Sequence, residues 1–390
     1  MRVQAAFFLD GNDPLGGVSL WSLRIARALV RSAGAAAIGL NDGEPAAPYS
    51  ASLLDGFTVS RATVTGAEQP GLPFGNTVGA WDDLSPDAQR CAATTDVFFP
   101  NYFEFAFRLA ATARLAGHPA RVVAMCHTDE PYYYHLLTKY APVITRFVAV
   151  SRRCYQSLEQ ALPSRIADMV YLPYGTEMPV ASPAIRPPEV PIRLLHVGRL
   201  EQRQKRVLDL VPLTRGLTAS GCPFDLRIVG DGSCRDALSA ALGDLPASVT
   251  FVGVKTGDAL RAEYRRADVL VMPSETEGLS FVLLEAMSHG VVPVVSRVSG
   301  SEDLVESGVN GDLFDVGDLA AATAAICALA ADRASLGAAG KRARDTIAAD
   351  YTWDRHVAAI GEQIAIARAA PAISADAAKR VLACGTYFAG

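Results

Sequence analysis

The sequence has no excess of basic residues, and this argues against a nucleic-acid-binding protein. Its 36 Lys and Arg residues are outnumbered by 41 Asp and Glu residues, giving a formal net charge of −5. The balance is similar along the chain, because the residues up to position 176 contain 14 Lys and Arg against 15 Asp and Glu. A nucleic-acid partner would require a basic surface, so we expect none.

Paired cysteines and long hydrophobic runs are also lacking. The seven cysteines are scattered, odd in number and without a C-x-x-C pair, so neither a disulfide framework nor a zinc site is expected. No uninterrupted apolar run reaches the roughly 18–20 residues that span a bilayer, and no signal-peptide pattern opens the chain. We therefore expect a cytoplasmic protein that is not integral to a membrane.

Three patterns of known catalytic sites are missing as well. The first strand is not followed by G-x-G-x-x-G, which argues against a dinucleotide-dependent oxidoreductase. No D-x-D follows a strand, so we expect no bound Mg²⁺ or Mn²⁺ and no cofactor. No Ser-His-Asp or paired-carboxylate glycosidase arrangement is visible. Any catalysis must therefore use other groups.

The chain is long enough for two domains. Its 390 residues allow two separate cores, and apolar strands alternate with helical patterns along most of the chain, which predicts parallel α/β sheets. Prolines gather between Pro173 and Pro191, as in a linker. We expect an α/β protein with two Rossmann-like domains facing across a cleft, at residues 1–176 and 190–352, followed by C-terminal helices at 353–390.

The stretch Ala267–Gly290 contains the most informative pattern. It predicts a strand at Asp268–Met272, a turn with Glu277, and an apolar helix from Leu279 in which Glu285 lies about two turns along. A helix start presents unpaired backbone N–H groups and partial positive charge, which suit a phosphate. The plain alternative is that Glu277 caps the helix and Glu285 is a solvated surface residue. Because its neighbours are apolar, an ionised Glu285 is expected to have a partner.

The segment E-G-L-S-F-V-L-L-E-A-M, with seven residues between its glutamates, resembles the E-x7-E signature of retaining glycosyltransferases of the GT-B type. These have two Rossmann-like domains, and their family-four group includes sucrose and glycogen synthases. The resemblance covers about residues 1–365 and implies that the C-terminal helices at 353–390 cross back to the first domain. It implies transfer of a sugar, with retention of anomeric configuration and without a metal ion, from a nucleoside-diphosphate sugar linked to UDP or GDP. The acceptor would be a hydroxyl group of a glycan, a lipid-linked molecule or a small molecule.

The same resemblance assigns the donor's diphosphate to Arg199 and Lys205, which follow a strand in G-R-L-E-Q-R-Q-K-R. Two cations neutralise a leaving diphosphate, although basic residues taken alone are more often surface charges. The lysine comes six positions after the arginine rather than the common five, and Arg206 stands where a glycine often follows. Arg203 or Arg206 is therefore a further candidate for this role.

The resemblance also implies that Glu277 binds sugar hydroxyls and that Glu285 binds the ribose diol. The other implied donor contacts are made largely by backbone groups, at the helix start and after two earlier strands: Gly278, Leu279, Ser280, Gly230 and Val254. Taken alone, the G-D-G around Gly230 predicts only a turn.

In the first domain, Gly16 and Gly17 precede a helix after the first strand. They either form a tight turn or let a phosphate approach the backbone, and the resemblance places them against donor phosphates and acceptor. His127 follows the strand Arg121–Cys126, at the edge where parallel sheets bind ligands. It is either structural or, by the resemblance, a residue that binds sugar hydroxyls or the developing phosphate charge. Acceptor recognition is expected in the variable segment Asn41–Arg90.

Two further questions stay open at this point. Arg24, Arg27 and Arg31 share one helix face, which is either a solvated surface or a peripheral contact with anionic lipid at the inner face of the membrane. The fold is also shared by hydrolysing sugar-nucleotide epimerases, which convert their donor without an acceptor. A non-catalytic subunit that only binds a sugar nucleotide is a further alternative. It is disfavoured because the chain contains all four motif residues, namely Glu277, Glu285, Arg199 and Lys205.

Overall fold

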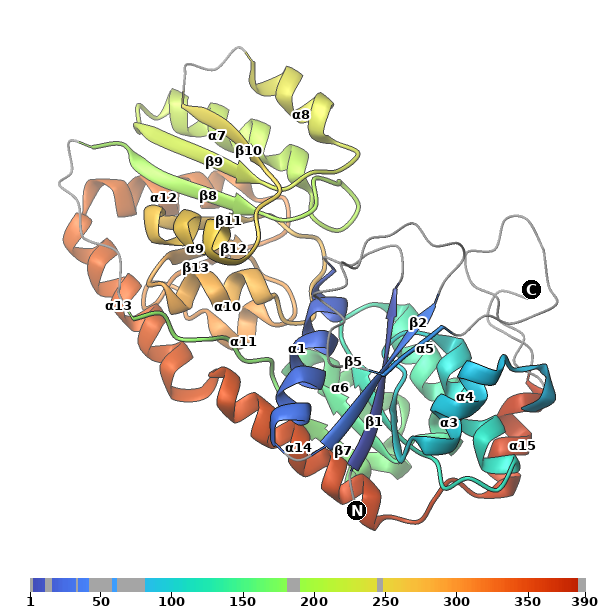
Figure 1. Cartoon of the computed structure of the whole chain (residues 1–390). Coiled ribbons are helices and arrows are strands. Elements are labelled where there is room, and N and C mark those ends of the chain that lie inside the picture. Colours follow the sequence, from blue (N-terminus) through green and yellow to red (C-terminus); the bar gives the residue numbers. More distant parts are fainter. Residues whose placement is uncertain are drawn as a thin grey trace. The chain divides into compact units, whose positions relative to one another are not determined.

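The chain folds into two α/β units in the computed structural model, which describes residues 3–10, 16–32, 34–41, 58–61, 81–180, 190–243 and 248–384. The first unit comprises Met1–Leu172 and Val357–Gly390, and the second comprises Pro173–His356. In each unit the strands lie between helices (Figure 1).

The first unit is built on a seven-stranded parallel sheet with the strand order β3-β2-β1-β4-β5-β6-β7. Its strands are β1 (Val3–Asp10), β2 (Gly34–Asn41), β3 (Thr58–Arg61), β4 (Val97–Phe99), β5 (Arg121–Cys126), β6 (Arg146–Ala149) and β7 (Met169–Tyr171). Its helices are α1 (Gly17–Ser32), α3 (Pro86–Thr94), α4 (Glu104–Leu115), α5 (Pro131–Tyr140), α6 (Arg152–Ala161), most of α14 (Trp353–Ala369) and α15 (Ala375–Ala383), with short 3₁₀ helices at Trp81–Asp83, Ala141–Val143 and Pro163–Asp168. The central strands are apolar and buried, as expected for parallel strands covered on both faces.

The second unit is built on a six-stranded parallel sheet with the order β10-β9-β8-β11-β12-β13. Its strands are β8 (Ile192–Val197), β9 (Phe224–Val229), β10 (Val249–Gly253), β11 (Val269–Met272), β12 (Val292–Ser296) and β13 (Asp312–Phe314). Its helices are α7 (Leu210–Ala219), α8 (Arg235–Leu242), α9 (Gly257–Arg266), α10 (Phe281–Ser288), α11 (Ser301–Leu304), α12 (Leu319–Ala331) and α13 (Arg333–Asp350), with a 3₁₀ helix at Val207–Asp209. The strand expected at Asp268–Met272 is present here as β11, which begins one residue later.

Both sheets have the strand order of a Rossmann fold, in which the direction of chain progression reverses near the centre. The reversal lies between β1 and β4 in the first unit and between β8 and β11 in the second. The expectation of two Rossmann-like α/β domains is therefore confirmed. Ligands of such sheets bind beside the carboxyl ends of the two strands at the reversal.

The C-terminal residues return to the first unit and complete its core. The α15 helix packs against α4, and its buried residues Ala378 and Val381 join the apolar cluster of this unit. Arg108 on α4 donates hydrogen bonds to the carbonyls of Val381 and Leu382, at 3.3 and 3.1 Å. The α15 helix thus covers one side of α4.

None of the described helices has, by itself, the length and hydropathy of a membrane span. Only the pair α12 and α13, bent by 109°, reaches them jointly.

Candidate functional site

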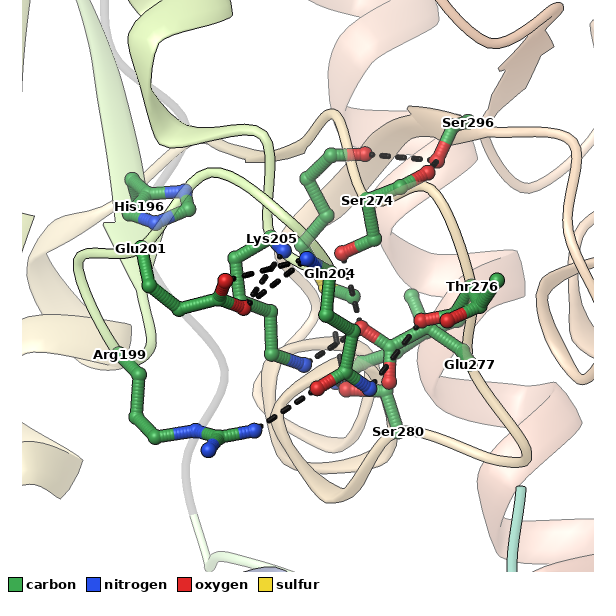
Figure 2. A network of polar contacts seen from close by, with 12 residues as sticks. His196, Arg199, Glu201, Gln204, Lys205, Ser274, Thr276, Glu277, Ser280 and Ser296 are labelled. Carbon is green, nitrogen blue, oxygen red and sulfur yellow. Dashed lines mark hydrogen bonds and ion pairs between the residues drawn. The ribbon is translucent and has the colours of Figure 1, made fainter. Parts of the chain in front are cut away.

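The loops that follow β8 and β11 meet at the carboxyl edge of the second sheet. The loop after β8 carries Arg199 and Lys205, and the loop after β11 carries Glu277 and leads into α10. Figure 2 shows side chains from both loops pointing toward one another. The structure thus brings four elements of the sequence prediction together, namely two cations, a carboxylate and a helix start, at the place where a Rossmann sheet binds its ligand.

An ion pair between Lys205 and Glu277 lies at the centre of this site. Lys205 Nζ is 2.6 Å from Glu277 Oε1, and the two side chains are 18% and 7% exposed. The hydroxyl of Ser274 donates a hydrogen bond to the same oxygen at 2.8 Å, while Ser296 Oγ donates to the carbonyl of Ser274 at 2.6 Å. Glu277 is thereby fixed in orientation by β11, β12 and the β8 loop together (Figure 2).

Gln204 connects the two loops, a role that no sequence pattern indicated. Its side-chain oxygen accepts a hydrogen bond from Arg199 at 2.8 Å, and its amide nitrogen donates to the carbonyl of Thr276 at 3.3 Å. The carboxylate of Glu201 accepts from the backbone N–H groups of Gln204 and Lys205, at 3.1 and 3.0 Å. The exposed guanidinium of Arg199 is therefore held at the edge of the site by residues of its own loop.

Arg206 has a left-handed backbone with a φ of 47°. This conformation explains why a glycine is common at this position in the family that the sequence resembles. The guanidinium is bound to Asp209 at 2.8 Å and to Glu275 at 2.7 Å, so Arg206 is already engaged by two carboxylates. Arg203 is exposed to solvent.

The helix α10 begins at Phe281, two residues later than the sequence suggested. Ser280 is its N-cap, and the Ser280 hydroxyl accepts a hydrogen bond from the backbone of Leu283 at 3.4 Å. The interpretation of Glu277 as a helix cap is therefore wrong.

Glu285 lies only about one turn into the helix rather than two, and it accepts a hydrogen bond from Tyr264 at 3.0 Å. The partner that an acidic group among apolar neighbours requires is thus present.

Gly278, Leu279 and Ser280 form a buried turn before α10 rather than its first turn. The backbone of Gly300 lies against this turn, since a Cβ atom on Gly300 would come within 2.1 Å of the Gly278 carbonyl oxygen. Gly300 also has a φ of 76°, so two separate constraints favour glycine there. The N–H groups available to an anion are those of the first residues of α10.

Gly230 and Val254 follow β9 and β10 at the same edge of the sheet. A Cβ atom on Gly230 would lie 1.8 Å from the carbonyl oxygen of Gly198, so the turn after β9 packs directly on the loop after β8. Val254 is 52% exposed.

In the first unit, His127 is buried in a polar network at the end of the sheet. Its Nε2 lies 3.0 Å from Oδ1 of Asn101, whose amide nitrogen donates to the Phe8 carbonyl at 2.7 Å and to Ser22 Oγ at 3.0 Å. Burial lowers the pKa of His127 to about 3, so the ring is neutral at pH 7. Because the Asn101 oxygen is an acceptor, Nε2 is the protonated nitrogen.

Gly16 and Gly17 precede and open α1, and the carbonyl of Gly16 accepts a hydrogen bond from Leu20 at 3.0 Å. Residues 11–15 of the same loop lie outside the described residues, as does most of the variable segment 41–90 in which acceptor recognition is expected.

Most of the second unit matches a known family of protein sequences. Residues 191–332 match the family model of glycosyl transferases group 1. Sulfoquinovosyl transferase SQD2 of Arabidopsis thaliana is 34% identical over 43% of this chain and 31% of its own length. The lipopolysaccharide 1,6-galactosyltransferase of Salmonella typhimurium is 32% identical over 42% of this chain and 45% of its own length. The chain thus spans less than half of the length of these curated relatives.

Comparison with solved structures covers nearly the whole chain. The sucrose-phosphate synthase of Thermosynechococcus elongatus superposes with a TM-score of 0.72 at 19% identity, over 93% of this chain and 98% of its own. Anabaena HepE in complex with UDP and glucose gives a TM-score of 0.73 at 19% identity, over 93% of this chain and all of its own. The lipopolysaccharide outer core galactosyltransferase WaaB gives 0.71 at 18% identity, over 93% and 99%. The fold is of the GT-B type. In this GT-B chain, the Lys205–Glu277 pair and the start of α10 both lie within the residues that the glycosyl transferase model matches.

Proposed function

We propose that the protein is a retaining glycosyltransferase of the family-four group, which moves a sugar from a nucleoside-diphosphate sugar to the hydroxyl group of an acceptor without a bound metal ion. The observation that carries this proposal is the meeting of Arg199, Lys205, Glu277 and the start of α10 at one edge of one sheet (Figure 2). Family model and relatives support transfer of a sugar.

The proposed roles follow from the charges in the reaction. A departing diphosphate gains negative charge, which Arg199, Lys205 and the free N–H groups of α10 stabilise. Glu277 binds hydroxyls of the transferred sugar, and Glu285 binds the ribose diol. Lys205 is paired with Glu277 in the structure, and in this proposal the donor's diphosphate draws the ammonium partly away from the carboxylate.

Retention of configuration needs no nucleophilic side chain in this proposal. The bond from the sugar's anomeric carbon to the phosphate oxygen breaks, and the acceptor oxygen bonds to the same face of that carbon. The proton of the acceptor hydroxyl passes to the leaving phosphate. In the first unit, His127 would donate or accept hydrogen bonds near the sugar as a neutral ring, because burial keeps it unprotonated.

The acceptor belongs to the same proposal. The names of the relatives mention lipopolysaccharide and D-inositol 3-phosphate, which cover a lipid-linked glycan and a small molecule. We propose a hydroxyl group of one of these classes as acceptor. For the lipid-linked case the protein would lie in the cytoplasm and touch the inner face of the membrane peripherally.

The test is slow donor hydrolysis by the purified protein across a panel of UDP- and GDP-linked sugars. One donor should release its sugar with the anomeric configuration of the donor, as read by NMR immediately after cleavage. Lys205→Ala and Glu277→Ala should each reduce this rate at least about 100-fold, the range seen when a charged transition-state contact is lost. Unchanged rates in both variants would refute the site.

Other outcomes of the same assay separate the alternatives. Conversion of the donor's sugar to an epimer with no acceptor present would identify a hydrolysing epimerase. Donor binding without any cleavage, with or without acceptor extracts, would indicate a binding subunit. Loss of activity in EDTA that manganese restores would contradict the metal-independent mechanism.

A further inference from the structure

His196 lies beside the Lys205–Glu277 pair and is not used in the mechanism above (Figure 2). It is the penultimate residue of β8 and is 2% exposed. Its Nδ1 lies 3.0 Å from the carbonyl oxygen of Val271 on the neighbouring strand β11. Since a carbonyl only accepts, Nδ1 carries the proton, and this bond fixes the orientation of the ring.

The other ring nitrogen is left as a bare acceptor. Nε2 has no hydrogen-bond partner among the described residues, although it is buried. Burial lowers the pKa of His196 to about 4, and the positive charge of Lys205 acts in the same direction. The ring is therefore neutral at pH 7, and Nε2 holds a lone pair without a donor. Burial of a polar atom without a hydrogen-bond partner reduces the stability of the folded protein, so such an atom is expected to gain a partner during function.

Lys205 is a neighbouring hydrogen-bond donor, and its positive charge acts on the His196 ring. Both side chains lie close to Gly198. A Cβ atom added to this glycine would be 3.8 Å from Nε2 of His196 and 4.0 Å from Cδ of Lys205. The ammonium of Lys205 has three N–H groups and is paired with Glu277. A direct contact between Nε2 and a bound ligand is disfavoured by the burial of that atom, so His196 would act through Lys205.

We propose that His196 is a positioning residue for Lys205: its Nε2 accepts a hydrogen bond from the ammonium when a donor's diphosphate draws Lys205 from Glu277. This inference rests on the proposed function. In the structure, Lys205 and Ser274 both donate hydrogen bonds to Oε1 of Glu277. In the donor complex the lysine binds phosphate and His196, which leaves the carboxylate of Glu277 for the sugar. The lysine thus moves between two acceptors, the carboxylate of Glu277 and Nε2 of His196.

Two substitutions of His196 test the roles of Nδ1 and Nε2 separately. In His196→Asn, the side-chain amide reaches the place of Nδ1 and preserves the bond to Val271, but nothing replaces Nε2. In His196→Gln, the longer amide supplies an oxygen near the place of Nε2. Binding of UDP and of GDP by titration calorimetry should weaken about tenfold in His196→Asn, with the melting temperature almost unchanged, and His196→Gln should recover part of this loss.

A double-mutant cycle shows whether His196 acts through the lysine. In a Lys205→Met background, His196→Asn should weaken nucleoside-diphosphate binding less than about twofold, since the donor of the hydrogen bond is gone. An equal loss in both backgrounds would overturn the proposal, as would native affinity in His196→Asn.

His289 provides a matched control. It is buried, its Nδ1 is bonded to a backbone carbonyl, and its Nε2 has no partner among the described residues. His289→Asn should leave the binding of inorganic pyrophosphate unchanged, whereas His196→Asn should weaken it.

If the wild-type protein binds neither UDP nor GDP, the proposed function fails. If it binds one of them and His196→Asn binds equally well, only the role of His196 fails.

Discussion

At the residue scale, Arg206 shows how this chain departs from the pattern it resembles. The backbone is left-handed, which costs about 1–2 kcal/mol for a residue with a Cβ atom. The side chain bonds to Asp209 and Glu275 across both loops of the site. Two partly exposed ion pairs offset part of that cost, so an arginine is tolerated where glycine is the simpler choice.

A comparison of two substitutions tests this interpretation. Both Arg206→Ala and Arg206→Gly remove the ion pairs, but only glycine removes the backbone strain. Arg206→Gly should therefore be more stable than Arg206→Ala by about 1 kcal/mol in urea unfolding. At the exposed Arg203, whose φ is not positive, the order should reverse, with alanine more stable than glycine. Equal stability of the two Arg206 variants would show that the strain is absent.

The site also shows which residues the sequence identifies and which it does not. Glu277 and Lys205 stand in recognisable motifs, and their meeting follows from the strand order. Gln204 and His196 make contacts with residues about 70 positions away, and no local pattern encodes such a pairing. Ser280 was identifiable, because serine is a preferred N-cap. The apolar run alone begins at Leu279 and therefore predicts the start of α10 two residues too early.

At the element scale, α4 explains why the chain needs its last helix. Ten consecutive residues from Glu104 to Ala113 are buried, so the helix must be covered all round. The sheet covers one side, and α15 packs on another. The sequence shows α4 as a helix but does not show its cover, because the contacts join residues more than 270 positions apart.

A substitution in α15 tests this packing. Val381→Ala removes buried methyl groups from the core of the first unit and should lower the free energy of unfolding by about 1–3 kcal/mol. Lys379→Ala, at an exposed position of the same helix, should change it by less than about 0.5 kcal/mol. Urea unfolding of both variants provides the measurement, and similar values for the two would refute the packing role of α15.

At the scale of the whole molecule, the buried histidines predict a dependence of stability on pH. Burial lowers the pKa of His127 to about 3 and that of His196 to about 4. Their ordinary value is about 6.5, so below that pH the unfolded chain binds protons that the folded chain does not. Their contribution to stability is complete above about pH 6.5 and is lost as the pH falls toward their folded values.

The free energy of unfolding should thus fall between about pH 6.5 and pH 4, by up to about 1.4 kcal/mol per pH unit for each histidine. Urea unfolding at several pH values measures this slope, and His196→Asn should reduce it. A stability that stays constant from about pH 7 to pH 5 would contradict the neutral, buried state of both rings.

Alternation of strands and helices was enough to predict two Rossmann-like domains, because each strand is apolar and each helix follows within the expected length. The return of the last residues to the first unit was expected only from the resemblance. The acceptor is the least predictable part, since the segment expected to bind it, 41–90, has little regular pattern.

In the proposed function, the cations after β8 bind a diphosphate. Calorimetric titration of the wild-type protein, Lys205→Ala and Arg215→Ala with UDP and GDP tests it most directly, since Arg215 is an exposed cation of the same unit. One nucleoside diphosphate should bind the wild type and Arg215→Ala equally, and Lys205→Ala at least about 30-fold more weakly, a loss of about 2 kcal/mol. Equal binding by all three proteins would contradict the account.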